Sequence, residues 1–153
     1  MSMVLREELS EGIVAITLNR PESLNALSPA LFSELNQIVT ELSKQTDSVG
    51  CVILRGAGRC FSAGNDLKAV RSGVKAKEKF FQAKTIDLIE KLPQPTIASV
   101  HGHCLTGALE LALACDLMIT SESANLADTH GKWGMVPGWG MSVRLPRRVG
   151  LLK

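Results

Sequence analysis

The stretch Pro95–Thr120, PTIASVHGHCLTGALELALACDLMIT, decides the fold class of this chain. TIASV is a short apolar run typical of a buried strand, and a glycine-containing turn leads from it into the helical pattern ALELALAC. DLMIT then reads as the next strand. Strands that alternate with helices indicate a mostly parallel sheet flanked by helices, which is an α/β fold.

The residues before this stretch follow the same alternation. Residues 3–9 and 13–20 predict a β-hairpin around the turn SEG, and GCVILRG, residues 50–56, predicts a short apolar strand. Between them, Ser28 followed by Pro29 is a helix start signal. We expect this helix to bury apolar residues at helical spacing: Leu31, Leu35, Ile38, Val39 and Leu42. In the hairpin, we expect Val14, Ile16 and Leu18 to alternate onto one face.

Two further segments complete the fold prediction. Lys77–Leu92 predicts an amphipathic helix that ends at PQP, with Phe81 and Leu88 facing inward together with Leu92. Residues 121–140 are rich in glycine and predict an irregular segment. Long irregular loops inside compact domains are more often functional or poorly ordered than idle.

Composition excludes several classes of function. The chain has 153 residues, of which 45% are hydrophobic and 21% charged, as in globular proteins. A net charge of +2 with mostly scattered basic residues, 4% aromatic residues and no tyrosine argues against a nucleic-acid partner. No apolar run is long enough to span a bilayer, so we expect no membrane association.

The four cysteines show no CxxC spacing, and three lie in or beside apolar runs: Cys51, Cys60, Cys104 and Cys115. They predict free, mostly buried thiols in a reducing compartment. No charged-then-apolar signal opens the sequence. We therefore expect a cytoplasmic protein, with import into an organelle left open.

The loop RCFSAGNDLK, Arg59–Lys68, is the first candidate site. It follows the predicted strand of residues 50–56, and Ala63, Gly64 and Asn65 lie where the backbone must turn sharply. Glycine permits close approach of a ligand, and free N–H groups there can bind a developing negative charge. The alternative is a plain surface turn, because Gly, Asn and Asp are common turn residues.

The second candidate is the start of the helix in the opening stretch. Its first N–H groups are unpaired, so Thr106 and Gly107 form a corner that favours anions. Glu110 lies in the first turn among leucines, where burial suits a general base. Its role can also be purely structural, because a carboxylate there can interact with the positive end of the helix dipole or form an ion pair with an inward arginine.

The histidines give weaker signals. His101 and His103 form an HxH pattern without a third ligand in view, so we expect no metal site. His130 lies in ADTHGKWG within the glycine-rich segment. A single loop histidine is usually solvated or hydrogen-bonded, and it can also act as an acid or base near neutral pH.

Three segments together resemble the crotonase superfamily, also called the enoyl-CoA hydratase/isomerase family. They are ITLNRPESLNALS, GRCFSAGNDLK and the opening stretch. In addition, MVPGWGMSVRLPRRVG matches the family's following loop and helix. The resemblance covers nearly the whole chain in order. It implies a crotonase-like ββα spiral core over residues 1–153 as one N-terminal core domain, with the family's C-terminal helical segment missing.

The resemblance also implies an activity and its machinery. Family members bind acyl-CoA thioesters and stabilise a thioester enolate with two backbone N–H groups, which match Asn65 and Gly107 here. The segment Ala63, Gly64, Asn65, Asp66, Leu67 and Lys68 matches the coenzyme A contact, with Lys68 near the charged end. Coenzyme A enters as part of the substrate, so no separate cofactor is implied, and the expected assembly is a homo-oligomer, either a trimer or a dimer of trimers.

The proton-transfer residues match the family only in part. Glu110 matches the first catalytic glutamate, whereas the second position is His130 rather than glutamate. Asp128 is a nearby carboxylate that could substitute. The modal activity is hydration of a 2-enoyl-CoA; double-bond isomerisation, thioester hydrolysis, decarboxylation, or a catalytically impaired acyl-CoA-binding remnant are the alternatives.

Overall fold

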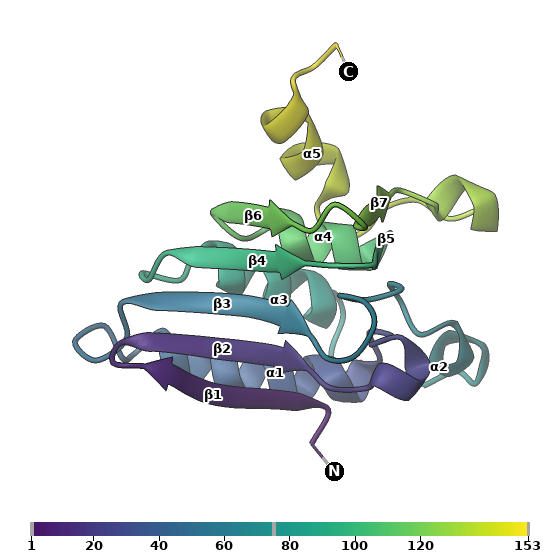
Figure 1. Cartoon of the computed structure of the whole chain (residues 1–153). Helices are drawn as coiled ribbons and strands as arrows, with labels where there is room; N and C mark the ends of the chain where they lie inside the picture. The colour runs from purple at the N-terminus through teal and green to yellow at the C-terminus, as the bar shows by residue number, and fades with distance from the viewer. Residues whose placement is uncertain (1, 75, 153) are drawn as a thin grey trace.

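A five-stranded sheet organises the computed structural model, which describes residues 2–74 and 76–152 (Figure 1). The strand order is β1-β2-β3-β4-β6, with β1 antiparallel to β2 and the other neighbours parallel. A separate two-stranded parallel sheet pairs β5 with β7. The strands are β1 (Val4–Ser10), β2 (Ile13–Leu18), β3 (Cys51–Gly56), β4 (Thr96–Val100), β5 (His103–Leu105), β6 (Leu117–Thr120) and β7 (Asn125–Ala127).

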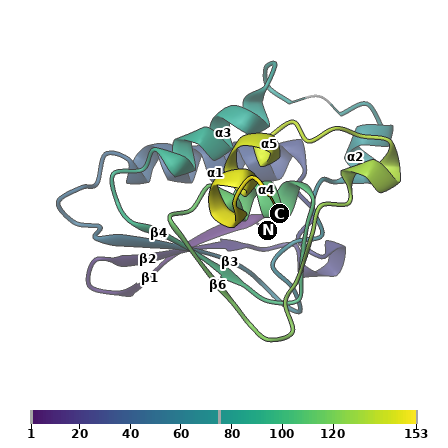
Figure 2. The same cartoon turned by 90° about the horizontal axis from the view of Figure 1, so that it is seen from above.

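The main helices cover one face of the large sheet, as the two views show together (Figures 1 and 2). The helices are α1 (Pro29–Leu42), α2 (Leu67–Arg71), α3 (Phe81–Glu90), α4 (Gly107–Leu113) and α5 (Met141–Val149), with short 3-10 turns η1 (Pro21–Ser23) and η2 (His130–Trp133). The core lies between this face and α1, α3 and α4. The predicted α/β class with a mostly parallel sheet is confirmed, with the long helices on one side of the sheet.

The parallel register places the core residues of neighbouring strands side by side. Val14 pairs with Val52, and Ile16 pairs with Leu54, all of them buried. The opposite face is partly polar: Arg55 forms an ion pair with Glu7 at 2.8 Å and donates a hydrogen bond to Thr17. The same face also carries apolar residues, because Ile53, Ile97 and Leu117 lie side by side on it and Leu117 is 58% exposed.

Helix α1 begins where the sequence predicts. The Ser28 side chain accepts a hydrogen bond from the N–H of Leu31, and Pro29 occupies the first helical position. The five predicted inward residues all pack on the core, with Ile38 partly buried. Local capping and helical spacing agree here with the tertiary packing.

Helix α3 differs from its prediction in two respects. It begins at Phe81 rather than at Lys77, because Phe80 has a left-handed backbone conformation with φ of 62°. The expectation that Leu88 faces inward is wrong, since Leu88 is 39% exposed and Ile86 and Ile89 are buried instead. The buried stripe of α3 consists of Phe81, Thr85, Ile86 and Ile89, and Leu88 lies at its edge.

The segment predicted to be irregular contains short ordered elements. Strand β7 pairs with β5 through Leu105 and Ala127, and η2 follows at His130. Helix α5 comes next and stands away from the sheet near the C-terminal end (Figure 1). Both β5 and β7 have only three residues, too few for a clear alternating pattern.

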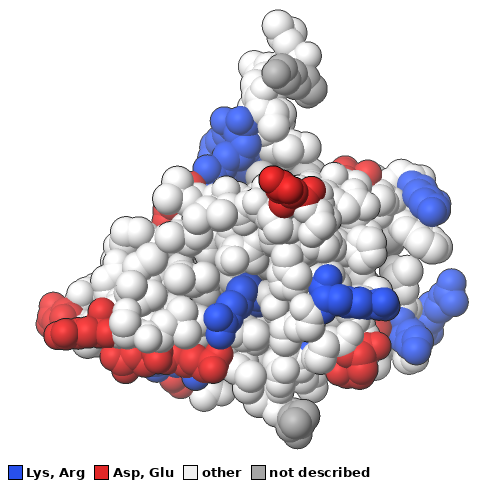
Figure 3. Space-filling view, viewed as in Figure 1, with Lys and Arg blue, Asp and Glu red and all other residues white. Residues whose placement is uncertain are grey.

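The cysteines are all free, and only Cys51 is partly exposed. Burial raises the pKa of the Cys104 and Cys115 thiols to about 12, so both remain protonated near neutral pH. None of the helices within the described ranges combines the length and apolar character needed to cross a membrane. Basic side chains in the view of Figure 3 are scattered rather than gathered into one surface.

Candidate active site

A cavity of about 310 Å³ lies where three segments meet: the loop after β3, the start of α4, and the segment between β7 and α5. Its wall is therefore made by parts of the chain that are far apart in sequence. The lining includes polar groups among apolar ones, as in small-molecule sites. The lining residues used below are Ala63, Asn65, Leu67, Gly107, Glu110, His130 and Trp139.

Gly64 brings the first of these segments against the second. Its φ is 94°, and a Cβ at this position would lie 2.6 Å from the carbonyl oxygen of Leu105. Any other residue would therefore be strained in conformation and would clash with the backbone. This close approach places Asn65 next to the start of α4.

The N–H of Asn65 points away from its neighbouring chain segment. Leu27 donates to the Gly64 carbonyl at 2.8 Å and accepts from the N–H of Asp66 at 3.2 Å. In this parallel bridge the N–H of the residue between them faces the other way. Among the described residues it has no hydrogen-bond acceptor, and it belongs to a residue on the cavity wall.

The start of α4 offers a second N–H of this kind. Thr106 has a φ of 51°, which is rare for a β-branched residue, and its N–H donates to the Ala127 carbonyl at 2.8 Å. Gly107 follows, and a Cβ there would overlap the ring of Trp139. No acceptor for the Gly107 N–H occurs among residues 2–74 and 76–152. Backbone strain of this sort is commonly stored at functional sites.

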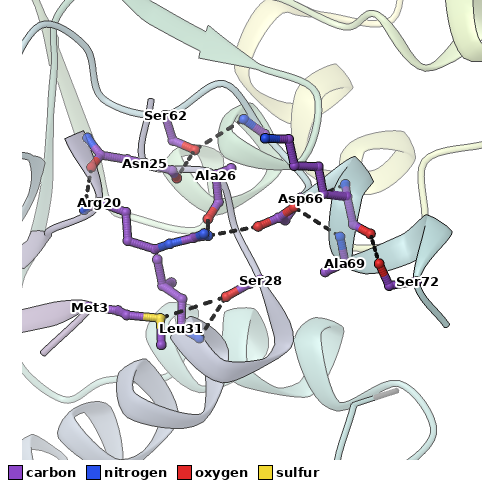
Figure 4. A network of polar contacts seen from close by, with 12 residues as sticks. Met3, Arg20, Asn25, Ala26, Ser28, Leu31, Ser62, Asp66, Ala69 and Ser72 are labelled. Carbon is purple, nitrogen blue, oxygen red and sulfur yellow. Dashed lines mark hydrogen bonds and ion pairs between the residues drawn. The ribbon is translucent and has the colours of Figure 1, made fainter. Parts of the chain in front are cut away.

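A polar network holds the loop in place (Figure 4). Arg20 forms an ion pair with Asp66 at 2.9 Å, and Asp66 also caps α2 by accepting from the N–H groups of Lys68 and Ala69. Burial alone would raise the pKa of Asp66, but the Arg20 guanidinium and these N–H donors hold it below its usual value. Ser62 donates to the Asn25 carbonyl and accepts from the Gly64 N–H.

Asn25 is the hub of this network and gives a stability prediction. Its side chain is fully buried, accepts from the Arg20 N–H, and contacts the carbonyls of Ala57, Cys60 and Phe61 at 2.8–3.1 Å. Each buried group left unpaired costs about 1–3 kcal/mol, so Asn25→Ala is expected to lower the free energy of unfolding by about 3 kcal/mol.

Urea unfolding measures this loss. Asn19→Ala is the matched control, because within the described ranges that side-chain amide bonds only the exposed Ser2 carbonyl, and its expected cost is below about 0.5 kcal/mol. Equal losses in the two variants would contradict the role given to Asn25.

Glu110 is the most unusual polar residue of the cavity. It is 1% exposed, and its Oε1 accepts from the N–H groups of Trp139 at 2.7 Å and Met141 at 3.1 Å. Its Oε2 is buried and has no partner among the described residues. Buried carboxylate oxygens are normally satisfied, so this orphaned oxygen marks Glu110 as a candidate for binding or chemistry.

His130 lies opposite this oxygen. Its Nε2 is 3.7 Å from Oε2 of Glu110, and the residue is 8% exposed. Its Nδ1 lies 2.6 Å from Oδ1 of Asp128, which also accepts the His130 backbone N–H at 3.0 Å. Burial would raise the pKa of Asp128, but these contacts with His130 outweigh it and lower the pKa. Asp128 thus contacts the far nitrogen of the imidazole.

The structure brings most of the candidate residues to one place. Ala63, Asn65, Leu67 and Gly107 line the cavity together with the acid–base candidates. The Gly64 Cα and the Asp66 side chain instead face neighbouring protein atoms, and Lys68 is exposed outside the cavity lining.

The HxH histidines lie elsewhere. His101 Nε2 is 2.9 Å from the Gly58 carbonyl, and His103 is exposed. Within the described ranges, no group of three or more His, Cys, Asp or Glu side chains is arranged to hold a metal ion.

Sequence reasoning missed the residues that hold Glu110. Trp139 donates its backbone N–H to Glu110. Its ring packs edge-on against that of Phe32, with the ring centroids 5.1 Å apart. The Trp139 carbonyl accepts from Arg144, which is 6% exposed and also bonds Asp87 and Glu90 of α3 at 2.6 Å each. A tryptophan in a glycine-rich segment was the only signal of this arrangement.

Arg144 therefore fixes the turn that holds Glu110, and its loss is expected to destabilise the protein. Arg144→Met removes four hydrogen bonds, but both carboxylate partners are half-exposed, which reduces the cost to about 2 kcal/mol. Arg147→Met is the control on the same helix, with an expected change within about 0.5 kcal/mol. Thermal unfolding of both variants measures their loss of stability. A larger loss for Arg147→Met than for Arg144→Met would contradict the role given to Arg144.

Comparison with known proteins gives a consistent result. The sequence model of the enoyl-CoA hydratase/isomerase family matches residues 8–153. "Probable enoyl-CoA hydratase 1, peroxisomal" of Arabidopsis thaliana is 39% identical over 144 residues, covering 94% of this chain and 54% of that protein. "Ethylmalonyl-CoA decarboxylase" of Gallus gallus is 35% identical over 143 residues, covering 91% of this chain and 48% of that protein.

Solved structures show the same similarity. The crystal structure of an enoyl-CoA hydratase from Bacillus anthracis matches with a TM-score of 0.88 and 37% identity, covering 97% of this chain and 59% of that one. The chain spans about half the length of the curated relatives it matches.

Proposed function

The chain belongs to the enoyl-CoA hydratase/isomerase family, and from this premise we propose that it adds water to the double bond of a 2-enoyl-CoA. The observation that carries the proposal is the orphaned Oε2 of Glu110, buried on the cavity wall and facing His130. A carboxylate oxygen in this position suits a general base.

Two backbone N–H groups are proposed to stabilise the charge that develops on the thioester. Those of Asn65 and Gly107 have no acceptor within the described part of the chain and belong to adjoining segments of one cavity wall. When hydroxide adds to the β-carbon, the electrons of the double bond move toward the thioester oxygen. Each fixed donor contributes about 3 kcal/mol to such a charged transition state.

Glu110 and His130 are the proposed proton-transfer groups. Glu110 takes a proton from water through Oε2, the hydroxyl bonds to the β-carbon, and a proton is returned to the α-carbon, so that one water is added overall. His130 is the second acid–base group at the position where the family has a glutamate. The two N–H donors on Oε1 keep the Glu110 carboxylate fixed during these steps.

Coenzyme A is proposed to lie along the loop from Ala63 to Lys68. Ala63 and Leu67 present the cavity side of this loop. Lys68 is exposed at the first turn of α2, where its ammonium group is free to meet phosphate groups. Gly64 and Asp66 stabilise the same loop through their contacts with neighbouring protein atoms.

Decarboxylation is a second candidate. The Gallus gallus relative is named as a decarboxylase, and His130 replaces a carboxylate that would repel a substrate carboxylate. Loss of carbon dioxide from a substituted malonyl-CoA gives the same thioester enolate, so the same two N–H groups would serve it.

Mixing the purified protein with crotonyl-CoA tests the proposed activity. Loss of the enoyl-thioester absorbance supports hydration. Release of carbon dioxide from ethylmalonyl-CoA without hydration of crotonyl-CoA would favour decarboxylation. Tight acyl-CoA binding without any turnover would instead support the alternative of a catalytically impaired acyl-CoA-binding remnant.

We also propose an assembly, a domain organisation and a location. A homo-oligomer, either a trimer or a dimer of trimers, and one core domain over residues 1–153 follow from the family pattern; light scattering after size-exclusion chromatography measures the first. A cytoplasmic location fits the free thiols, although one relative is named as peroxisomal. Cell fractionation distinguishes these compartments.

A further inference from the structure

Asp128 and His130 form a pair that the proposed hydration does not by itself require. One carboxylate oxygen of Asp128 contacts both the backbone N–H and the ring Nδ1 of His130, at 3.0 and 2.6 Å. Both groups come from one turn at the end of β7, so the ring is fixed by its own local backbone. The other ring nitrogen, Nε2, is on the cavity side, 3.7 Å from Glu110.

This contact determines where the ring proton lies. An ionised carboxylate only accepts hydrogen bonds, so Nδ1 must carry a proton to bond Asp128. In the neutral ring, Nε2 then has a free lone pair and acts as an acceptor. The tautomer is thus set by a residue outside the cavity lining.

Two acceptors consequently face each other on the cavity wall. Oε2 of Glu110 and Nε2 of His130 are too far apart at 3.7 Å for a direct hydrogen bond, and each is largely removed from solvent. A single oxygen atom between them can lie within hydrogen-bond reach of both. The ligand that satisfies two acceptors through one atom is a molecule with two donor hydrogens, and water is the smallest of these.

We propose that Asp128 is a positioning residue that holds His130 in the Nδ1–H tautomer, so that Nε2 and Glu110 Oε2 together bind the two hydrogens of the attacking water. Glu110 takes one proton, the hydroxyl bonds to the β-carbon, the double-bond electrons move toward the thioester oxygen, and that proton is returned to the α-carbon. His130 accepts the second hydrogen of the water and so orients it, which refines its role from a second acid–base group to the acceptor that holds the water. This inference rests on the proposed hydration for its chemistry and on the geometry alone for the tautomer.

Nitrogen-15 NMR of the imidazole rings tests the tautomer without any turnover. The chain has three histidines, and comparison with His130→Gln assigns the His130 signals. At alkaline pH, where imidazole is neutral, the wild-type ring is expected to carry its proton on Nδ1. Asp128→Asn keeps an oxygen acceptor and is expected to keep this tautomer, whereas Asp128→Ala is expected to give a mixture. A wild-type ring protonated on Nε2 would overturn the inference.

Kinetics with crotonyl-CoA tests the consequence. Groups that orient an imidazole in metal sites are worth about 10- to 100-fold, and we expect Asp128→Ala to lower kcat by a similar factor with KM changed less than about twofold. The loss in Asp128→Asn is expected to be about tenfold smaller. Equal losses in both variants, or a change in KM alone, would contradict a role through the tautomer.

Two further outcomes remain distinguishable. If Asp128→Ala does not fold, Asp128→Ser replaces it, because its hydroxyl can accept the backbone N–H but is too short for the ring. If the protein hydrates no enoyl-CoA but shows the expected tautomers, the proposed function fails and the assignment of Asp128 stands. If hydration occurs with an Nε2–H ring, the function stands and the assignment of Asp128 fails.

Discussion

Replacement of Glu110 by glutamine is expected to reduce kcat/KM for crotonyl-CoA by about 10²- to 10⁴-fold, the usual contribution of a general base. Glutamine has the same shape, and its amide oxygen can still accept the N–H groups of Trp139 and Met141. The fold is therefore retained while the proton acceptor at Oε2 is lost. Steady-state kinetics measures the change, and circular dichroism checks the fold.

Glu122→Gln is the matched control for this substitution. Glu122 is exposed and forms no ion pair within the described residues, so its kcat/KM is expected to stay within about twofold of the wild type. If Glu110→Gln kept the full rate, Glu110 would not be the base, and its orphaned oxygen would need a structural explanation.

Asn65→Pro is expected to lower kcat by about 10²- to 10³-fold, the cost of removing one donor from an oxyanion hole. Proline has no N–H, so it removes the proposed contact with the thioester oxygen. Asn65→Ala keeps the N–H, and the Asn65 side chain forms no hydrogen bond with another described residue. The alanine variant is therefore expected to stay within about fivefold of the wild-type rate.

Binding of a saturated acyl-CoA separates loss of chemistry from loss of fold. Asn65→Pro is expected to bind it within about tenfold of the wild type, because a transition-state donor contributes little to the ground state. A proline variant with unchanged kcat would exclude the Asn65 N–H from the oxyanion hole. A large loss in the alanine variant would instead assign the function to the side chain.

The parts of the site that follow from local sequence were predictable. A glycine-containing turn and a helix start after a buried strand both indicate unpaired N–H groups, whereas the choice of Asn65 and Gly107 as a pair came from the family resemblance. Glu110 stands out as the only charge in an Ala/Leu helix. These signals are local in sequence, and capping and turn preferences act over the same few residues.

The parts that depend on long-range contacts were not predictable. The hydrogen bonds from Trp139 and Met141 to Glu110 connect residues about thirty positions apart. Their donors are backbone N–H groups, so the sequence shows no side-chain pattern for them. Leu88 was misplaced because the apolar spacing of Phe81, Leu88 and Leu92 is also helical, whereas packing buries Ile86 and Ile89 instead. Asp128 is close in sequence to His130, but which ring nitrogen it contacts follows from the turn that β7 imposes.

Enolate chemistry at Glu110 is tested most directly by converting crotonyl-CoA in deuterated water and locating the deuterium by NMR. The expected product carries a hydroxyl on the β-carbon and one deuterium on the α-carbon, and Glu110→Gln forms it at least about 100-fold more slowly. Unchanged crotonyl-CoA in the presence of the wild-type protein, or equal rates for the two proteins, would contradict the proposed chemistry.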